Sequence, residues 1–131
     1  MRRLSIDVVP GDYAIARLDP AQTVPPELLS NGARALVSIT RTAHEISVIC
    51  PAELAPIGGT VERGWRLLSV RGPLEFTLTG IIAAIASELA AAGVALFSLS
   101  TYDTDHVLVQ DRDLARATRA LEASGHEVHA G

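Results

Sequence analysis

The clearest pattern of apolar and polar positions lies in the second half of the chain, where alternating runs predict strands and a longer apolar run predicts a helix. The predicted elements are a strand, a helix, two strands, a helix and a strand, at residues 65–71, 79–92, 94–101, 105–110, 111–124 and 127–129. Gly93 and Gly125 can end the two helices, because glycine readily adopts the left-handed conformation that follows a last helical turn. This β-α-β-β-α-β order predicts a ferredoxin-like α+β fold, with two helices on one face of an antiparallel sheet.

The first half is less regular. Its predicted strands lie at residues 4–9, 13–18, 35–40 and 45–50, with at most one helical turn at 26–30. The tripeptide Pro10-Gly11-Asp12 predicts a turn between the first two strands. Residues 51–64 contain two prolines and three glycines, and this composition predicts a linker between the two halves.

A short pattern occurs in both halves. Residues 36–49 align without a gap on residues 96–109, an offset of 60 residues (96 minus 36) that places Ser38 on Ser98 and Glu45 on Asp105. Two hairpins of the same layout indicate two related units, the first with degenerate helices; a chance match is the alternative.

The two predicted helices differ in surface chemistry. The first carries a single charge, Glu88, among Ile, Leu and Ala, whereas an exposed helix usually has a broad polar face. We therefore expect it to pack on two sides, against its own sheet and against the other half or another copy, which predicts a homodimer. The second helix turns Arg112, Arg116 and Arg119 to water and is an ordinary surface helix.

Composition excludes several function classes. The net charge of −4 gives no electrostatic reason to expect nucleic acid or an anionic membrane as a partner. All 11 basic residues are arginines, so Schiff-base chemistry and a phosphate-binding loop lysine are excluded. The single cysteine, Cys50, ends an apolar run and is expected to be buried. No apolar run fits a signal peptide or a membrane span, so a cytoplasmic location is expected.

Two segments carry candidate chemistry. Residues 72–82 lead into the first predicted helix, whose N-terminal N–H groups suit a carboxylate; Gly80 allows close approach, and Thr77 and Thr79 can add hydroxyl contacts. Asp103 and Asp105 in the later hairpin can hold an ammonium or guanidinium group. The alternatives are that residues 72–82 only lead into a capped helix, and that Asp103 and Asp105 are ordinary turn residues without a ligand. The histidines lack metal-ligand spacing and no nucleophile motif is present, so neither a metal, a cofactor nor a catalytic residue is predicted.

Three segments carry a resemblance to a known family: Leu-Glu-Phe-Thr-Leu-Thr-Gly-Ile-Ile at 74–82, Leu-Ser-Thr-Tyr-Asp-Thr-Asp-His-Val-Leu-Val at 99–109, and most of 38–48. The chain resembles small bacterial ACT-domain proteins related to the ACT modules of the cytosolic arginine sensors of the CASTOR type. The resemblance implies an ACT domain at residues 61–131, preceded by a degenerate ACT-like half at residues 1–60. It also implies a regulatory module that binds an amino acid at an interface between ACT-like units, and not an enzyme.

In the arginine sensors, the ligand lies between the strand-to-helix loop of one ACT unit and a strand of its neighbour. The resemblance places the following residues at the site: Thr79, Gly80, Ile81 and Ile82 at the ligand's backbone end, Thr101, Tyr102 and Asp105 at its side-chain end, and Ser47 and Val48 from the first half. One departure is that a second acidic contact, expected in the strand-to-helix loop, is not clearly present: the nearest carboxylate is Glu75, and Leu78 stands closer to the helix. Arginine specificity therefore does not follow, and a partner-binding module with an empty pocket is the alternative function.

Overall fold

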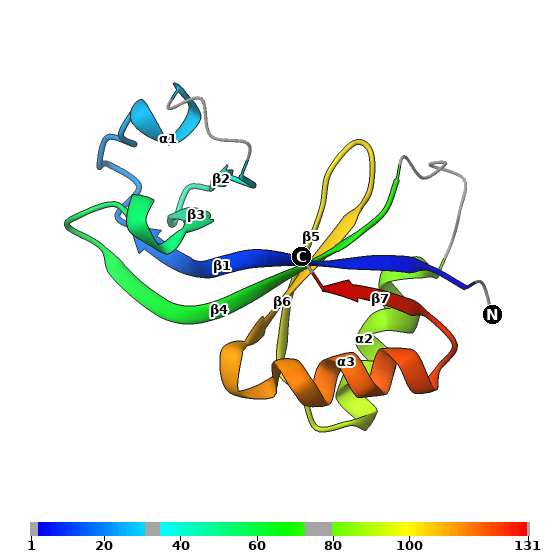
Figure 1. The fold of residues 1–131 in the computed structure, drawn as a ribbon. Coiled ribbons are helices and arrows are strands. Elements are labelled where there is room, and N and C mark those ends of the chain that lie inside the picture. The colour runs from blue at the N-terminus through cyan, green and yellow to red at the C-terminus, as the bar shows by residue number, and fades with distance from the viewer. Residues whose placement is uncertain (1–2, 31–34, 73–79, 131) are drawn as a thin grey trace. The chain divides into compact units, whose positions relative to one another are not determined.

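The computed structural model describes residues 3–30, 35–72 and 80–130. Their elements in chain order are β1 (Ser5–Leu18), α1 (Glu27–Ser30), β2 (Ser38–Arg41), β3 (Ile46–Pro51), a 3-10 turn (Ala52–Leu54), β4 (Thr60–Val70), α2 (Ile81–Ala91), β5 (Leu96–Ser100), β6 (Asp105–Gln110), a 3-10 turn (Asp111–Asp113), α3 (Leu114–Ala123) and β7 (Glu127–Ala130) (Figure 1).

The succession β4-α2-β5-β6-α3-β7 confirms the predicted ferredoxin-like order and the α+β class. Hydrogen-bonded neighbours follow the order β2-β3-β1-β4-β6-β5, and β7 pairs with the start of β1 in parallel, Ser5 opposite Glu127 and Val8 opposite Ala130. The start of β1 therefore lies between the first and last strands of the β-α-β-β-α-β unit.

Two sequence-based boundaries are wrong. The predicted turn at Pro10-Gly11-Asp12 lies inside the single strand β1, where Gly11 has φ 91°. The predicted linker at 51–64 is partly strand, because β4 begins at Thr60 and contains Gly64 with φ 81°. Glycine inside a strand often marks a local irregularity of the ladder rather than its end, and both glycines have a positive φ within their strands.

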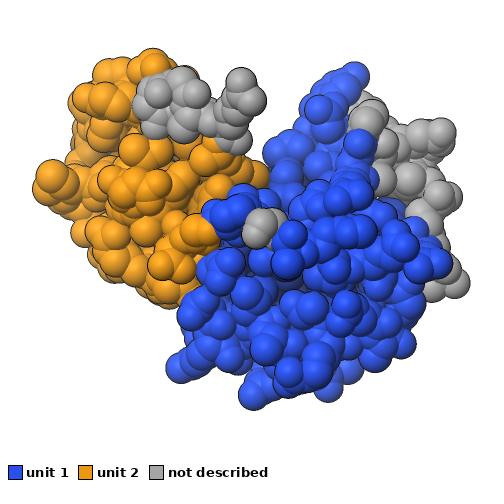
Figure 2. Space-filling view, viewed as in Figure 1, with its two compact units in different colours: residues 1–10, 66–131 blue, residues 11–65 orange. Residues whose placement is uncertain are grey.

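The chain forms two compact units that are not consecutive segments. Unit 1 comprises residues 1–10 and 66–131, and unit 2 comprises residues 11–65 (Figure 2). The division into two related ACT-like units at 1–60 and 61–131 stays a prediction.

The core of unit 1 fills the space between one face of its strands and the two helices α2 and α3. Alternate strand residues point to this face, as expected for a sheet covered on one side. The buried residues are Leu4, Ile6, Val8, Leu68, Val70, Val107 and Val109 from the strands, Ile85 and Leu89 from α2, Val94, and Ala117 and Leu121 from α3. Each fully buried Leu, Ile or Val contributes about 1.5–3 kcal/mol, so this layer is the main source of stability in unit 1.

Unit 2 has a separate core around β1 and β3. Its buried members are Ala16, Leu18, Leu28, Ile46, Val48 and Cys50. The thiol of Cys50 is fully buried, as the sequence predicts, and this burial raises its pKa above the ordinary value. A neutral, inaccessible thiol is a poor nucleophile, so Cys50 acts as a small apolar residue.

The two hairpins match at an offset of 59 residues, not 60. Arg41 pairs with Ile46 in the first hairpin and Ser100 pairs with Asp105 in the second, leaving four-residue turns at 42–45 and 101–104. Thr42 N donates to the Glu45 carbonyl at 2.9 Å, and Thr101 N donates to the Thr104 carbonyl at 2.8 Å. The gapless sequence alignment is therefore wrong by one residue, and such a slip would reverse the faces of every side chain.

Candidate functional site

The turn of the β5–β6 hairpin holds three predicted ligand-binding residues, Thr101, Tyr102 and Asp103. The Thr101 hydroxyl donates to the Thr104 carbonyl at 3.2 Å and closes the turn on itself. Tyr102 is 80% exposed at the tip, and Asp103 is also exposed. The structure thus brings these residues together on one accessible turn.

Thr104 anchors this turn to the end of β4. Its hydroxyl donates to the carbonyl oxygen of Val70 at 2.7 Å, so the hairpin tip lies beside the point where β4 leaves the sheet. Figure 1 shows the β5–β6 hairpin and the end of β4 at the same end of the sheet. The end of β4 at Val70 therefore lies next to the predicted contacts from the hairpin.

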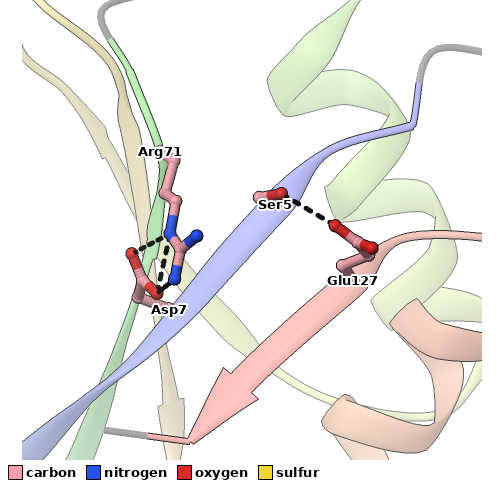
Figure 3. Close-up of polar contacts among 4 residues, drawn as sticks. All are labelled: Ser5, Asp7, Arg71 and Glu127. Atoms are coloured by element: carbon pink, nitrogen blue, oxygen red, sulfur yellow. Dashed lines mark hydrogen bonds and ion pairs between the residues drawn. The ribbon is translucent and has the colours of Figure 1, made fainter.

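Arg71 fixes the end of β4 against β1. Its Nε and Nη2 groups donate to the carboxylate of Asp7 at 2.8–3.1 Å, and its backbone N–H donates to the Ser5 carbonyl at 2.8 Å (Figure 3). The Arg71 hydrogen bonds lower the pKa of the Asp7 carboxyl, with burial acting in the opposite direction. The ion pair stays formed at neutral pH and defines where the strand-to-helix segment begins.

The N-terminus of α2 begins at Gly80, whose φ of 79° is left-handed. The Gly80 carbonyl accepts the first helical hydrogen bond from Ala84 at 2.8 Å, and no side chain caps the helix. The first N–H groups of the helix therefore have no intrahelical acceptor. Ile81 and Ile82 are half-buried and pack against the core of unit 1. Thr77 and Thr79, together with Glu75, lie outside the described residues.

Asp105 occupies an unusual position at the start of β6. Side chains alternate along a strand, so Asp105 shares a face with Val107 and Val109, which pack in the helix-covered core. At the 59-residue offset its counterpart is Ile46, which is fully buried in the core of unit 2. Its Oδ1 accepts a hydrogen bond from the Ser100 hydroxyl at 2.5 Å. A carboxylate thus stands on the helix side of the sheet where the other hairpin has an apolar side chain.

Ser47 and Val48 belong to β3 in unit 2. Ser47 is half-buried, whereas the side chain of Val48 is fully buried in the core of that unit. Any contact from Val48 to a ligand would therefore use its backbone. The part played by both residues stays a prediction.

The sequence did not single out Ser69 and His106, which lie on the opposite face of the sheet from Asp105. The Ser69 hydroxyl and His106 Nδ1 are 2.8 Å apart, and burial lowers the pKa of His106 although Asp105 acts to raise it. Because side chains alternate between the two faces of a strand, the sequence could have identified both residues. Ser69 lies between the core residues Leu68 and Val70, and His106 precedes the core residue Val107. No carboxylate among the described residues hydrogen-bonds to His106, so the pair lacks the third member of a catalytic triad.

Two further properties concern only the described part of the chain. It contains no group of three or more His, Cys, Asp and Glu side chains that could hold a metal ion. It also contains no helix of the length and apolarity required to cross a membrane.

Comparison with known proteins connects this geometry to a family. Residues 60–123 match the model of the ACT domain, and residues 11–57 match a model that describes an N-terminal domain. The cytosolic arginine sensor for mTORC1 subunit 1 of Homo sapiens is 37% identical over 59 residues, which cover 44% of this chain and 18% of the sensor. The chain therefore spans less than a fifth of that relative's length.

Two solved structures extend the comparison. A crystal structure of a protein from Agrobacterium tumefaciens is 33% identical, with a TM-score of 0.88, and the match covers 100% of this chain and 96% of that chain. The ligand-free regulatory subunit of aspartate kinase from Thermus thermophilus has a TM-score of 0.63 at 13% identity, covering 92% and 96%, and shows the shared fold alone. Residues 60–123 thus form an ACT domain, and the chain is related to the ACT modules of the CASTOR-type arginine sensors.

Proposed function

We propose that this protein is a non-catalytic regulatory module that binds an amino acid through unit 1. The observation that carries the proposal is Asp105, a carboxylate on the helix-covered face where the equivalent hairpin position is the buried Ile46. An acidic side chain at the end of a row of apolar side chains does not stabilise the core by packing, but it can bind a positively charged group. The name of the related arginine sensor supports the same class of ligand.

The uncapped start of α2 supplies the other half of the site. Its N-terminal N–H groups and the positive end of the helix favour the α-carboxylate of the ligand, and Gly80 allows close approach to the backbone because it has no side chain. The ligand's positive group binds Asp105, with Tyr102 and Asp103 beside it on the turn. A second ACT-like unit, carrying Ser47 and Val48 or their equivalents, completes the site. Binding would order the turn and the helix start together.

The first test is a thermal-shift screen of the full chain against the twenty amino acids, followed by calorimetric titration of any that stabilise it. A ligand at about 100 times its dissociation constant adds about 2.7 kcal/mol, which raises Tm by several degrees. We expect a positively charged amino acid to give such a shift and Asp105→Asn to abolish it.

Asp12→Asn is the matched control, because it removes an exposed carboxylate that lies outside the predicted site residues. The amino-acid site would be disproved if no amino acid stabilised the protein, or if Asp105→Asn bound as tightly as the unaltered chain.

A second candidate function is a dimerisation module without a ligand. The exposed face of α2 consists of Ala83, Ser87, Ala90 and Ala91, small side chains that permit close helix approach. This candidate predicts a dimer in light scattering at micromolar concentration that Ala90→Arg converts to a monomer. It also predicts no amino-acid response in the thermal-shift screen.

The proposed location is the cytoplasm, as in the name of the related cytosolic sensor. Fractionation of cells that express the full-length protein tests this, and recovery in a membrane or secreted fraction would contradict it.

A further inference from the structure

The imidazole of His126 is a buried titratable group that the proposed amino-acid site does not use. His126 follows α3, where its backbone N–H donates to the Leu121 carbonyl at 3.1 Å. The whole residue is 4% exposed, and its side chain has no accessible surface. Among the residues that the structure describes, it is the only histidine, acidic or basic residue buried to this degree. A buried polar ring needs hydrogen-bond partners, so its two contacts decide its protonation state.

Both ring nitrogens of His126 have a partner. The buried backbone N–H of Leu4 donates to Nδ1 at 3.1 Å, and Nε2 lies 2.9 Å from Glu88 Oε1. A backbone N–H can only donate, so Nδ1 is the acceptor and carries no hydrogen. The ring hydrogen is therefore assigned to Nε2, which donates to Glu88. This arrangement of contacts requires a neutral imidazole.

A second proton on the imidazole conflicts with the contact to Leu4. The only free position for it is Nδ1, where the new N–H would face the N–H of Leu4. Two donors cannot hydrogen-bond to each other, and buried donors without acceptors are costly. Movement of Leu4 away from the ring removes the conflict, because each N–H can then bond to water. The contact between Nε2 and Glu88 is the same in both arrangements, so it does not resist the release of Leu4.

Few other charges surround the ring. The N-terminal segment contributes Arg3 and β7 contributes Glu127; these two side chains pair at 3.1 Å, and both are exposed. Glu122 of α3 is exposed as well. Within the described part of the chain, Glu88 of α2 carries the only charge that hydrogen-bonds to the imidazole. The direct effect of a proton on Nδ1 therefore falls on the backbone N–H that faces it.

Leu4 connects the imidazole to the start of the β1–β7 pairing. Its carbonyl accepts a hydrogen bond from the Glu127 N–H at 2.9 Å, next to the first pair of the ladder, Ser5 opposite Glu127. Beyond this point Arg71 holds β1, since its N–H donates to the Ser5 carbonyl at 2.8 Å. Release should thus be confined to the segment before Ser5. We propose that His126 is a pH-sensitive latch for the start of β1, which holds Leu4 while the imidazole is neutral and releases it when the imidazole is protonated.

The test is an NMR titration of the isotope-labelled full chain from about pH 8 to about pH 5, where histidines ordinarily titrate. The ring ¹⁵N signals of His126 show which nitrogen carries hydrogen, and amide hydrogen exchange gives the protection of Leu4. After correction for the intrinsic pH dependence of exchange, we expect the protection factors of Leu4 and Glu127 to fall about tenfold, as for the loss of one hydrogen bond. Amides of the interior strand β6 should keep their protection.

The same titration identifies the histidine responsible. His106 on β6 and His129 on β7 also lie in unit 1, and their ring signals are measured together with those of His126. The loss of protection at Leu4 should follow the protonation of His126 and not that of the other two imidazoles.

Two variants separate a latch from a merely structural contact. Glu88→Gln keeps an acceptor for Nε2–H but removes the negative charge beside the imidazolium, so Leu4 should retain its protection to lower pH than in the unaltered chain. A structural role alone would lower its protection at every pH. Ser87→Ala, on the exposed face of α2, is the matched control and should leave the pH response unchanged. His126→Asn supplies an acceptor oxygen that does not titrate, so protection of Leu4 should no longer depend on pH.

Three results would overturn the proposal: an imidazole of His126 that stays neutral down to pH 5, unchanged protection of Leu4 while His126 is protonated, or the unaltered pH response in Glu88→Gln. If His126→Asn does not fold, the comparison of Glu88→Gln with Ser87→Ala decides alone.

Discussion

His126 Nε2 lies 2.9 Å from the Glu88 carboxylate in the interior of unit 1, where the imidazole is fully buried and the Glu88 side chain is 11% exposed. The backbone N–H of Leu4 donates to His126 Nδ1 at 3.1 Å. Nδ1 is therefore the acceptor nitrogen, so the ring hydrogen is assigned to Nε2, which donates to Glu88. The only charge on α2 thus joins this helix to the segment before β7 and, through the imidazole, to the start of β1.

This relationship predicts unequal effects of two substitutions at position 88. Glu88→Ala leaves the buried Nε2–H without an acceptor and should lower the free energy of unfolding by about 1–3 kcal/mol. Glu88→Gln keeps an acceptor oxygen and should cost clearly less. Urea unfolding measures both, with Ser87→Ala on the exposed face of α2 as a near-neutral control. Equal losses in the two Glu88 variants would mean that the hydrogen bond to His126 contributes nothing.

The Asp7–Arg71 pair predicts a pH dependence of stability. The pKa of the Asp7 carboxyl is lowered in the folded state, chiefly by the hydrogen bonds from Arg71. Its contribution to stability is therefore complete above the unfolded-state pKa, near 3.9, and is lost as the pH falls through the lower folded-state pKa. Both side chains are more than a third exposed, so the effect should be small and should shrink with added salt.

Denaturant unfolding at about pH 6 and at about pH 2.5 tests this prediction, because the two values lie on either side of the unfolded-state pKa of an aspartate. Asp7→Asn should lose less stability between them than the unaltered chain. Asp12→Asn, an exposed position of β1, should behave as the unaltered chain. An identical acid response in Asp7→Asn would contradict the role of the pair.

The partly buried imidazole of His106 predicts a second pH dependence of stability, which arises from burial and not from an ion pair. Burial lowers the pKa of His106, and the negative charge of Asp105 partly offsets this. The unfolded chain therefore binds the proton more readily, so stability is complete above the ordinary value of about 6.5 and falls as the pH drops through that value toward the folded-state pKa.

NMR titration of the imidazole measures the effect of Asp105 on His106 directly. Asp105→Asn should lower the pKa of His106 further, because it removes the neighbouring negative charge. Asp103→Asn should leave the titration of His106 unchanged. A higher pKa of His106 in Asp105→Asn would show that the charge of Asp105 does not act on the imidazole.

Substitutions of Gly80 are expected to lower the free energy of unfolding by different amounts. Its left-handed φ of 79° disfavours any side chain, although an added Cβ would meet no heavy atom within 4 Å. Gly80→Ala should therefore cost about 1 kcal/mol from backbone strain alone. Gly80→Asn should cost less, because asparagine tolerates this conformation better. Urea unfolding gives the order, and a larger loss for Asn than for Ala would point to steric crowding instead of strain.

The sequence by itself determined most elements of the β-α-β-β-α-β unit. Strand periodicity, helix periodicity and the helix-ending glycines are local properties, and they predicted β6 at its observed bounds and α2 and α3 within a few residues. The resemblance to ACT domains also came from local runs, including the turn at residues 101–104. The acidic residues of that turn region, Asp103 and Asp105, were predicted as site residues from their charge, and Asp105 also from the resemblance.

Only the tertiary structure decided how these elements meet. The insertion of β1 between β7 and β4 depends on backbone pairing between residues 5–8 and 127–130, at opposite ends of the chain, which no local pattern encodes. The one-residue correction of the hairpin equivalence came from the strand register, because only the cross-strand pairs show which residues occupy the same place in the two hairpins. The contacts Thr104–Val70, Arg71–Asp7 and His126–Glu88 join residues far apart in the sequence, and the fold alone places these polar groups within hydrogen-bonding distance.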